Sequence, residues 1–159
     1  MSKVRIHPSA VVMGDVKFAD GVNVWPNAVI RADLAPVEMG EGSNLQDCAV
    51  IHVSPGVPTI IGRGVTIGHN ATVHACTIGD NALIGMGATI LDGAVIGANS
   101  IVGAGAVVSP NTQVPEGSLV LGVPALVKRP TRPEEHAANR QNAEEYLELA
   151  AKWLPEEDR

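Results

Sequence analysis

A large apolar residue, usually a branched aliphatic one, recurs at every sixth position along most of this chain, and this repeat limits the folds that the chain can adopt. The repeat falls into four series, Ile6–Ile30, Met39–Ile51, Ile61–Val73 and Ile78–Val120. A period of six is neither the 3.6-residue period of an α-helix nor the simple alternation of a long strand. It predicts a short strand and a corner, repeated many times, with one apolar side chain of each strand pointing inward.

Three short strands and three corners would form one triangular coil of about 18 residues, and such coils would stack about 4.8 Å apart through backbone hydrogen bonds. On this spacing, roughly seven coils account for residues 1–125. A narrow prism also explains why 45% of the residues are hydrophobic but only 3% are aromatic, because rings fit poorly inside it. We expect glycine to permit the tight corners where it follows the apolar residue, at Gly62, Gly68, Gly79, Gly85, Gly97 and Gly103.

The sequence changes character after the repeats. Pro133 suits the first turn of an α-helix, and Glu134 and Glu135 suit its positive N-terminal end. Apolar residues at helical spacing follow, and Pro155 would end the helix. We therefore divide the chain into an all-β solenoid domain at 1–125 and a segment at 126–159, which comprises a linker and one C-terminal α-helix packing on the solenoid.

Charge and composition exclude some classes of partner. The chain has 11 Lys and Arg against 17 Asp and Glu, a net charge of −6, and no basic run, so we expect no nucleic-acid binding. No apolar stretch is long enough to span a bilayer, and the N-terminus lacks the apolar core of a signal peptide, so we expect no membrane association and a cytoplasmic location. Cys48 and Cys76 form no CxxC pair, and we expect both to be buried small apolar residues.

The repeats resemble those of the hexapeptide-repeat superfamily, whose fold is a left-handed parallel β-helix. The resemblance covers nearly the whole predicted solenoid. The segment Gly122-Val123-Pro124-Ala125 also resembles the one that ends the β-helix in many of these proteins. Left-handed crossovers are rare between parallel strands, so the expected handedness rests on the resemblance alone.

The repeat also predicts which residues stack on one another. Ile51 and Val73 are three strands apart, so they belong to the same side of consecutive coils once a short insertion between them is allowed for. The residue that follows each inward aliphatic points outward. We therefore expect His52 and His74 to lie one above the other on an outer face, with Arg31 in the coil below.

His69 belongs to the preceding side of the prism, together with Gln46 and with Asp47 one coil beneath it. The chain from His69 to His74 could extend up to about 16 Å, less the corner, whereas ligand nitrogens lie only about 2.0–2.1 Å from zinc. One prism is therefore not expected to gather all three histidines on one ion. Three prisms around a threefold axis could do so, if His69 of one subunit faces His52 and His74 of another.

Four motifs resemble those of a narrower family, the gamma-class carbonic anhydrases and their close relatives. They are Arg31-Ala32-Asp33, Asn44-Leu45-Gln46-Asp47, Val50-Ile51-His52 and the segment Ile67–Cys76. The resemblance implies a homotrimer in which His52 and His74 of one subunit and His69 of the next hold a zinc ion. Some relatives have a tyrosine near this site, and Tyr146 is the only candidate here.

The resemblance also assigns roles around the metal. Gln46 would orient solvent or substrate, and Asn44 belongs to the same motif and is a further candidate. Arg31, Asp33 and Asp47 would form an ion-pair network at the subunit interface.

The implied reaction follows from this ligand set. Three neutral imidazoles leave one position on zinc open, and zinc lowers the pKa of bound water from about 15.7 to about 7. Hydroxide would then be available at neutral pH to attack CO2 and give bicarbonate, in a reversible hydration. Imidazole sites accept several divalent metals, so Fe²⁺, Co²⁺ and Ni²⁺ are alternatives to Zn²⁺.

Departures from the family keep other functions open. Leu34 follows Asp33 where some members carry a proton-shuttling Glu, and the insertion at 53–58 contains no acid. The same β-helix in other families serves acyltransferases, in which a His acts as general base beside acyl-CoA. A thioesterase and a metal-binding trimer without catalysis are the remaining alternatives. His7 and His136 are expected to be solvated residues without partners.

Overall fold

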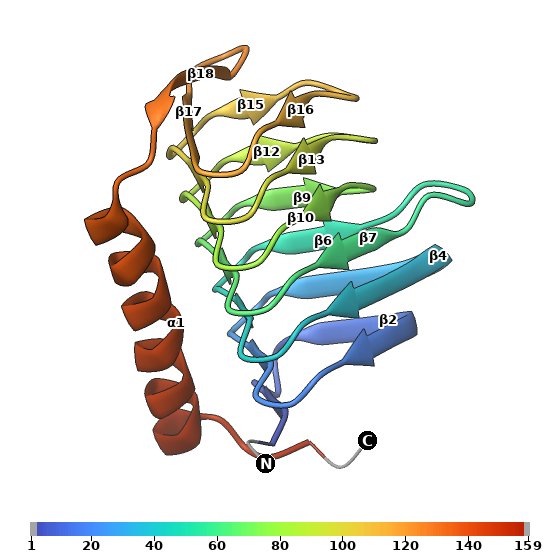
Figure 1. Ribbon diagram of the computed structural model, residues 1–159. Coiled ribbons are helices and arrows are strands. Elements are labelled where there is room, and N and C mark those ends of the chain that lie inside the picture. The colour runs from blue at the N-terminus through green and yellow to red at the C-terminus, as the bar shows by residue number, and fades with distance from the viewer. Residues whose placement is uncertain (1–2, 158–159) are drawn as a thin grey trace.

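The computed structural model describes residues 3–157, and in it the chain winds into a triangular prism with one helix along its side (Figure 1). The strands are β1 (Arg5–Ile6), β2 (Val11–Phe18), β3 (Asn23–Val24), β4 (Val29–Met39), β5 (Asn44–Leu45), β6 (Val50–His52), β7 (Thr59–Ile61), β8 (Thr66–Ile67), β9 (Thr72–His74), β10 (Thr77–Ile78), β11 (Leu83–Ile84), β12 (Thr89–Ile90), β13 (Val95–Ile96), β14 (Ile101–Val102), β15 (Val107–Val108), β16 (Gln113–Val114), β17 (Ser118–Leu121) and β18 (Leu126–Pro130). They precede a single helix, α1 (Pro133–Trp153). Among these residues, no helix is both long and apolar enough to cross a membrane.

Consecutive coils pair through parallel strands, as the expected left-handed β-helix of hexapeptide repeats requires. One side of the prism stacks β1, β3, β5, β8, β11, β14 and β17. The other two sides join into a second sheet, because β2 and β4 continue through a corner without a break. The solenoid therefore completes about six turns. Our estimate of seven was high because only the first side reaches a seventh strand.

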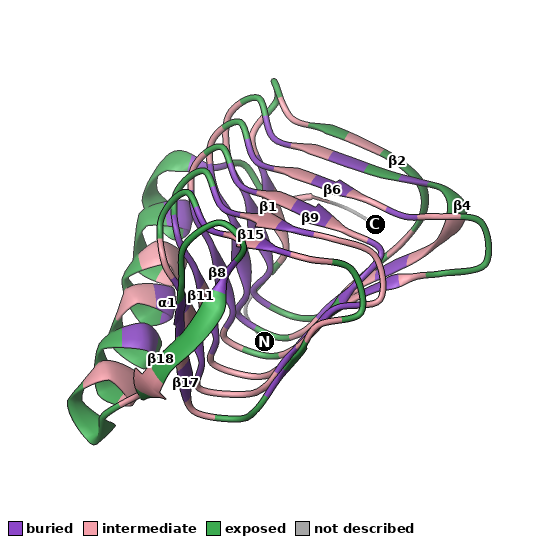
Figure 2. Ribbon diagram, turned by 90° about the horizontal axis from the view of Figure 1, so that it is seen from above, coloured by how far each residue is buried: buried purple, intermediate pink, exposed green. Residues whose placement is uncertain are grey.

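The apolar repeat lines the interior of the prism, as the sequence predicted. Every repeat residue is buried except Val12 and Phe18, which are partly buried and pack against the core in the lowest coil. The pairing keeps these residues in columns; for example, Ile51 pairs with Ile30 below it and with Val73 above it. Figure 2, seen from above, shows the triangular outline with α1 along one side.

The corners differ from our expectation about glycine. Other residues adopt the left-handed conformation at the corners; for example, Asn27, Asn70 and Gly105 have φ of 58°, 58° and 68°. Glycine that follows an inward aliphatic instead lies against the next coil: a Cβ at Gly79 would lie only 2.5 Å from the backbone nitrogen of Ala98. These glycines therefore permit the close stacking of coils rather than the turn itself.

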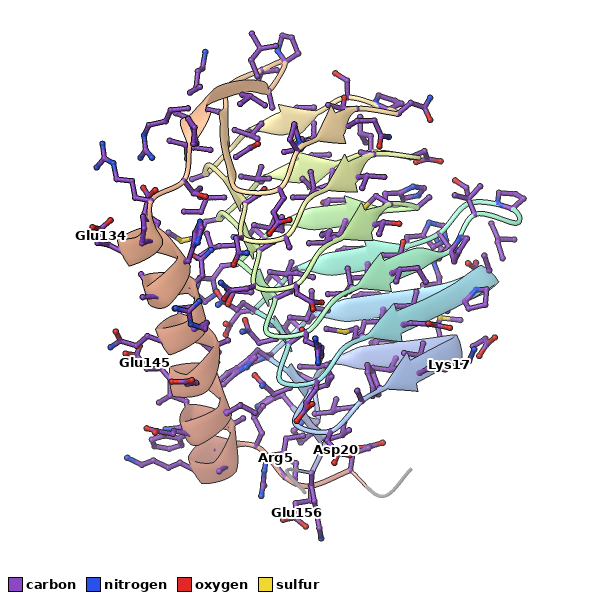
Figure 3. All side chains as sticks on the ribbon, in the orientation of Figure 1. Arg5, Lys17, Asp20, Glu134, Glu145 and Glu156 are labelled. Atoms are coloured by element: carbon purple, nitrogen blue, oxygen red, sulfur yellow. The ribbon has the colours of Figure 1, made fainter. Side chains whose placement is uncertain are left out.

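The C-terminal segment runs back along the prism from its top to its base (Figure 1). Residues expected to form a linker instead form β18, which pairs antiparallel with β17. Helix α1 then begins at Pro133 and ends at Trp153, close to the predicted bounds. After it, the Glu156 carboxylate accepts hydrogen bonds from Lys3 and Arg5. Figure 3 shows Arg5 and Glu156 together at the base of the prism.

Replacing Gly79 with alanine should destabilise the β-helix. Its Cβ would meet backbone rather than a movable side chain, so we expect the free energy of unfolding to fall by about 1–3 kcal/mol, as overpacking generally costs. Gly105→Asn is the matched control: nothing lies within 4 Å of a Cβ there, and asparagine already occupies equivalent corners, so the change should stay within about 0.5 kcal/mol. Urea unfolding measures both. Equal losses in the two variants would contradict the role assigned to Gly79.

An ion pair at the start of α1 should make stability depend on pH. Glu135 accepts two hydrogen bonds from Arg129, at 2.7 and 2.9 Å, and one from the backbone N–H of Arg132 at 2.8 Å. The Arg129 guanidinium, followed by this N–H, lowers the pKa of Glu135 from 4.5 to about 2. Because the folded state has the lower pKa, the contribution is complete above about pH 4.5 and is lost as the pH falls through about 2.

Glu135→Gln should therefore lower the melting temperature at pH 7 and converge on the parent protein near pH 2. Glutamine can still accept the N–H of Arg132, so the change isolates the charge. Glu134→Gln is the control, because Glu134 has no ion pair among the described residues. Thermal unfolding followed by circular dichroism between pH 2 and 7 checks the prediction, and a deficit that does not vary with pH would refute it.

Candidate metal centre

Two histidines stack on one outer face of the prism. β6 and β9 pair in parallel so that His52 lies directly opposite His74. Their rings meet edge to face, with centroids 4.9 Å apart, and Nδ1 of His52 lies 3.0 Å from Nε2 of His74. The stacking of this histidine pair is therefore as the repeat predicted.

A carboxylate contacts the outer nitrogen of each ring in the histidine pair. Nε2 of His52 lies 2.8 Å from Oδ1 of Asp33, and Nδ1 of His74 lies 2.6 Å from Oδ1 of Asp92. Asp33 also accepts a short hydrogen bond from Arg31. Desolvation alone would raise the pKa of Asp33, but the hydrogen bonds from His52 and Arg31 outweigh it and hold the pKa below its usual value. Asp33 is therefore an anion at neutral pH.

The histidine pair fits two positions of a tetrahedral zinc ion. Ligand nitrogens about 2.0–2.1 Å from zinc would be about 3.3–3.4 Å apart, which is close to the 3.0 Å between Nδ1 of His52 and Nε2 of His74. Histidines that bind metals usually donate their other ring N–H to a carboxylate or carbonyl. Asp33 and Asp92 already occupy those positions, so the donor set and its surroundings suit a divalent metal.

His69 lies on a different side of the prism. β5 and β8 pair with Leu45 opposite Ile67, which places Asp47 one coil beneath His69. Oδ2 of Asp47 lies 2.9 Å from Nδ1 of His69. Within residues 3–157, no three His, Cys, Asp or Glu side chains converge as a metal site. A single chain thus keeps its three candidate histidines on two faces, in line with the distance argument from the sequence.

Gln46 is held by a hydrogen-bond chain that reaches α1. Gln46 is only 4% exposed, and its Nε2 donates to Oδ1 of Asn44 at 3.1 Å. Nδ2 of Asn44 donates to Oγ1 of Thr66, which also accepts a hydrogen bond from Asn142 of the helix at 2.8 Å. The roles of Thr66 and Asn142 could not be read from the sequence, because their contact depends on how α1 docks.

A groove of about 430 Å³ runs between α1 and the side that carries His69. Gln46, His69 and Tyr146 line it together with apolar residues, including the exposed Met86. The Tyr146 ring packs edge to face on Trp25, with centroids 5.2 Å apart. Burial, and secondarily the Asp47 carboxylate, raise the pKa of Tyr146. The structure therefore brings Gln46, His69 and Tyr146 together, apart from the histidine pair.

Two residues beside the histidine pair were missed from the sequence. Asp92 contacts His74, and its other oxygen accepts a short hydrogen bond from the hydroxyl of Ser54. The Ser54 hydroxyl lowers the pKa of Asp92; partial desolvation opposes this shift, and His74 adds to it. The sequence analysis did not single out Asp92, because only the residue directly after an inward aliphatic was expected to point outward from a strand. Ile90 pairs with Val73, so Leu91 lies at the level of His74 and Asp92 falls in the corner that follows.

Both cysteines and the two remaining histidines also carried expectations from the sequence. Cys76 is buried, as expected, and burial raises the pKa of its thiol to about 12. Cys48 is exposed, against our expectation, because it occupies a corner with φ of 61°. His7 and His136 were expected to lack partners, but each contacts a hydroxyl group, at 2.8 and 2.7 Å.

Models of known protein families match the part of the chain that carries the six-residue repeat. Residues 75–110 match a model described as bacterial transferase hexapeptide (six repeats), and residues 58–91 match one described as the hexapeptide repeat of succinyl-transferase. A solved structure from Bacillus cereus, named "putative acetyltransferase", superposes with a TM-score of 0.93 at 37% identity, covering 96% of this chain and 89% of that one.

Named proteins that are similar over nearly the whole chain identify a narrower family. The "Probable carbonic anhydrase" of Methanocaldococcus jannaschii is 58% identical over 92% of both chains. "Gamma carbonic anhydrase 2, mitochondrial" of Arabidopsis thaliana is 40% identical over 92% of this chain, which spans 55% of that protein. With the hexapeptide coils in the structure and this identity over nearly the whole length, the chain belongs to the gamma carbonic anhydrase-like family of hexapeptide-repeat proteins.

Proposed function

We propose that the protein is a zinc-dependent gamma-type carbonic anhydrase that hydrates CO2 reversibly to bicarbonate at the interfaces of a homotrimer. The observation that carries the proposal is the histidine pair, in which the inner nitrogens lie 3.0 Å apart and each outer nitrogen meets a carboxylate. This arrangement suits a metal with an incomplete set of protein ligands. The relatives named as carbonic anhydrases support the same activity.

Both candidate faces expose apolar side chains that an interface would bury. Met13, 49% exposed, pairs with Arg31 on the face of the histidine pair, and Leu34, 50% exposed, follows Asp33. On the other face, Met86 is 61% exposed in the groove beside His69. Packing the first face of one subunit against the second face of the next would cover both and bring His69 to the histidine pair.

The side chains then have distinct tasks. When bound, zinc supplies an acidified water, so that hydroxide is available near pH 7. Asp33 orients the imidazole of His52. Gln46 enters from the adjacent subunit with its amide held by Asn44, and it can orient CO2 or solvent by hydrogen bonding.

Tyr146, Asp47 and Arg31 complete the surroundings of this site. Tyr146 lines the groove, where its raised pKa keeps the phenol protonated and able to donate a hydrogen bond. Asp47 orients the His69 imidazole. Arg31, held by Asp33, is positioned to form the interface ion pair.

CO2 hydration by the metal-loaded protein is the direct test. We expect stopped-flow rates above buffer with zinc, and with iron loaded anaerobically. Because Leu34 and the loop at 53–58 offer no acid for proton export, the rate should rise with the concentration of imidazole buffer. Rates equal to buffer in both metal forms, with metal bound, would refute the proposal.

Mixed trimers test whether the metal site is shared. His69→Ala and the double variant His52→Ala/His74→Ala should each lose metal, because neither homotrimer has a complete ligand set. Refolding the two together should restore about one metal per mixed trimer, since one interface then combines intact ligands. Native mass spectrometry with metal analysis gives the result, and His7→Ala is the control. Metal retained by either pure variant, or none in the mixture, would contradict a shared site.

An acyltransferase is the second candidate, favoured by the groove and the contact of His69 with Asp47. A carboxylate that orients an imidazole beside a largely apolar groove is the arrangement that a general base requires, and the Bacillus cereus structure carries an acetyltransferase name. Calorimetry with acetyl-CoA distinguishes the two functions. Tight binding of acetyl-CoA that a chelator leaves unchanged would favour acyl transfer. Absence of acetyl-CoA binding would count against acyl transfer and favour the carbonic anhydrase.

A further inference from the structure

The carboxylate of Asp92 joins one histidine of the pair to the loop between β6 and β7. Its Oδ1 lies 2.6 Å from Nδ1 of His74, and its Oδ2 accepts the hydroxyl hydrogen bond of Ser54. Each oxygen therefore has its own partner. Ser54 is distant from Asp92 in sequence, so this contact ties the loop to a coil above it.

The backbone holds Asp92 in place from both neighbouring coils. The residue lies in the corner after β12, where Gly93 adopts φ of 73° and donates its N–H to the carbonyl of Ala75 at 2.7 Å. The carbonyl of Asp92 accepts the N–H of Asn111 from the coil above at 2.9 Å. The carboxylate is therefore positioned before any ligand arrives.

The loop at 53–58 is itself a closed turn, and it projects from the prism between β6 and β7 (Figure 1). Ser54 and Val57 exchange backbone hydrogen bonds at 3.2 and 2.9 Å, and the N–H of Gly56 reaches the carbonyl of Leu34 at 3.4 Å. These bonds give the Ser54 hydroxyl a defined position. The loop can therefore orient the carboxylate that it contacts.

We propose that Asp92 and Ser54 are positioning residues for His74. An acceptor at Nδ1 places the ring proton there and leaves the Nε2 lone pair facing His52, where the metal would bind. Ser54 holds the carboxylate through its second oxygen. Asp33 has the corresponding contact with His52 but divides its charge with Arg31.

This assignment gives the insertion a function that needs no acidic side chain. Through Ser54 and Asp92, the loop fixes the orientation of His74, a proposed metal ligand, and it does not transfer protons. Its part in metal affinity rests on the proposed function, whereas its effect on the tautomer of His74 can be measured without metal.

The first test is the tautomer of His74 in the metal-free protein. Long-range ¹H–¹⁵N spectra of histidine-labelled protein at pH 8 should show the proton on Nδ1 of His74. In Asp92→Ala this signal should change to the other tautomer or to a mixture, and Asp92→Asn, which keeps an acceptor oxygen, should change less. A purely structural role would not move this signal, so an unchanged tautomer in Asp92→Ala overturns the proposal.

The second test is zinc affinity by competition with a chromophoric chelator. We expect the zinc Kd to rise about 10–100-fold in Asp92→Ala, the usual cost of losing an outer-shell partner, and to rise less in Ser54→Ala. Asp80→Ala is the matched control: Asp80 also lies two residues after an inward isoleucine and has similar exposure, 48% against 46%, but contacts Arg63. Its Kd should stay within about twofold of the parent protein.

The two tests separate the inference from the proposed function. A parent protein that binds no zinc defeats the proposed function, and the spectra of the metal-free protein still decide whether Asp92 sets the tautomer. If zinc binds and Asp92→Ala matches Asp80→Ala in Kd, the inference fails while the proposed function stands. Melting temperatures of both variants show whether any loss of affinity reflects unfolding.

Discussion

Backbone hydrogen bonds between parallel strands of successive coils determine the geometry of both the core and the candidate site of this protein. They fix the distance between coils, so that glycine is needed where one coil lies directly on the next, as at Gly79. They also fix the register, and a shift by one residue would turn the inward aliphatics outward. The same register places His52 against His74 and Asp47 beneath His69. Core and candidate site are therefore two consequences of one pairing pattern.

Periodicity predicted the features that follow from this register alone. The buried columns, the histidine pair and the separation of His69 all follow from counting strands, because each inward aliphatic marks one side of the prism. The same counting overestimated the turns, since a single extra strand occupies one side. It could not anticipate the return of the chain in β18, which depends on a hairpin beyond the repeats.

Corners and insertions account for what the sequence did not reveal. Asp92 was not identified because it lies in a corner, one residue beyond the position that pairs at the level of His74, and the count of strands gives no orientation for corner side chains. Ser54 sits in an insertion, where no period applies. Cys48 is small enough to be buried, but its corner conformation exposes it. Thr66 and Asn142 come into contact only when α1 packs on the prism. Their connection to Gln46 therefore depends on a tertiary contact that no local sequence pattern indicates.

The return of α1 to the base of the prism changes how the solenoid is expected to unfold. In an open solenoid each coil touches only its neighbours, so either end can fray independently. Here the tail after α1 pairs with the first strand: the carbonyl of Leu154 accepts a hydrogen bond from Arg5 at 2.8 Å, and the N–H of Glu157 donates to Val4 at 3.0 Å. These contacts connect the C-terminal tail to the first coil, so the two ends of the stack of coils are joined. Opening the first coil requires release of the tail, so the two ends are expected to unfold together, with the cooperativity of a globular domain.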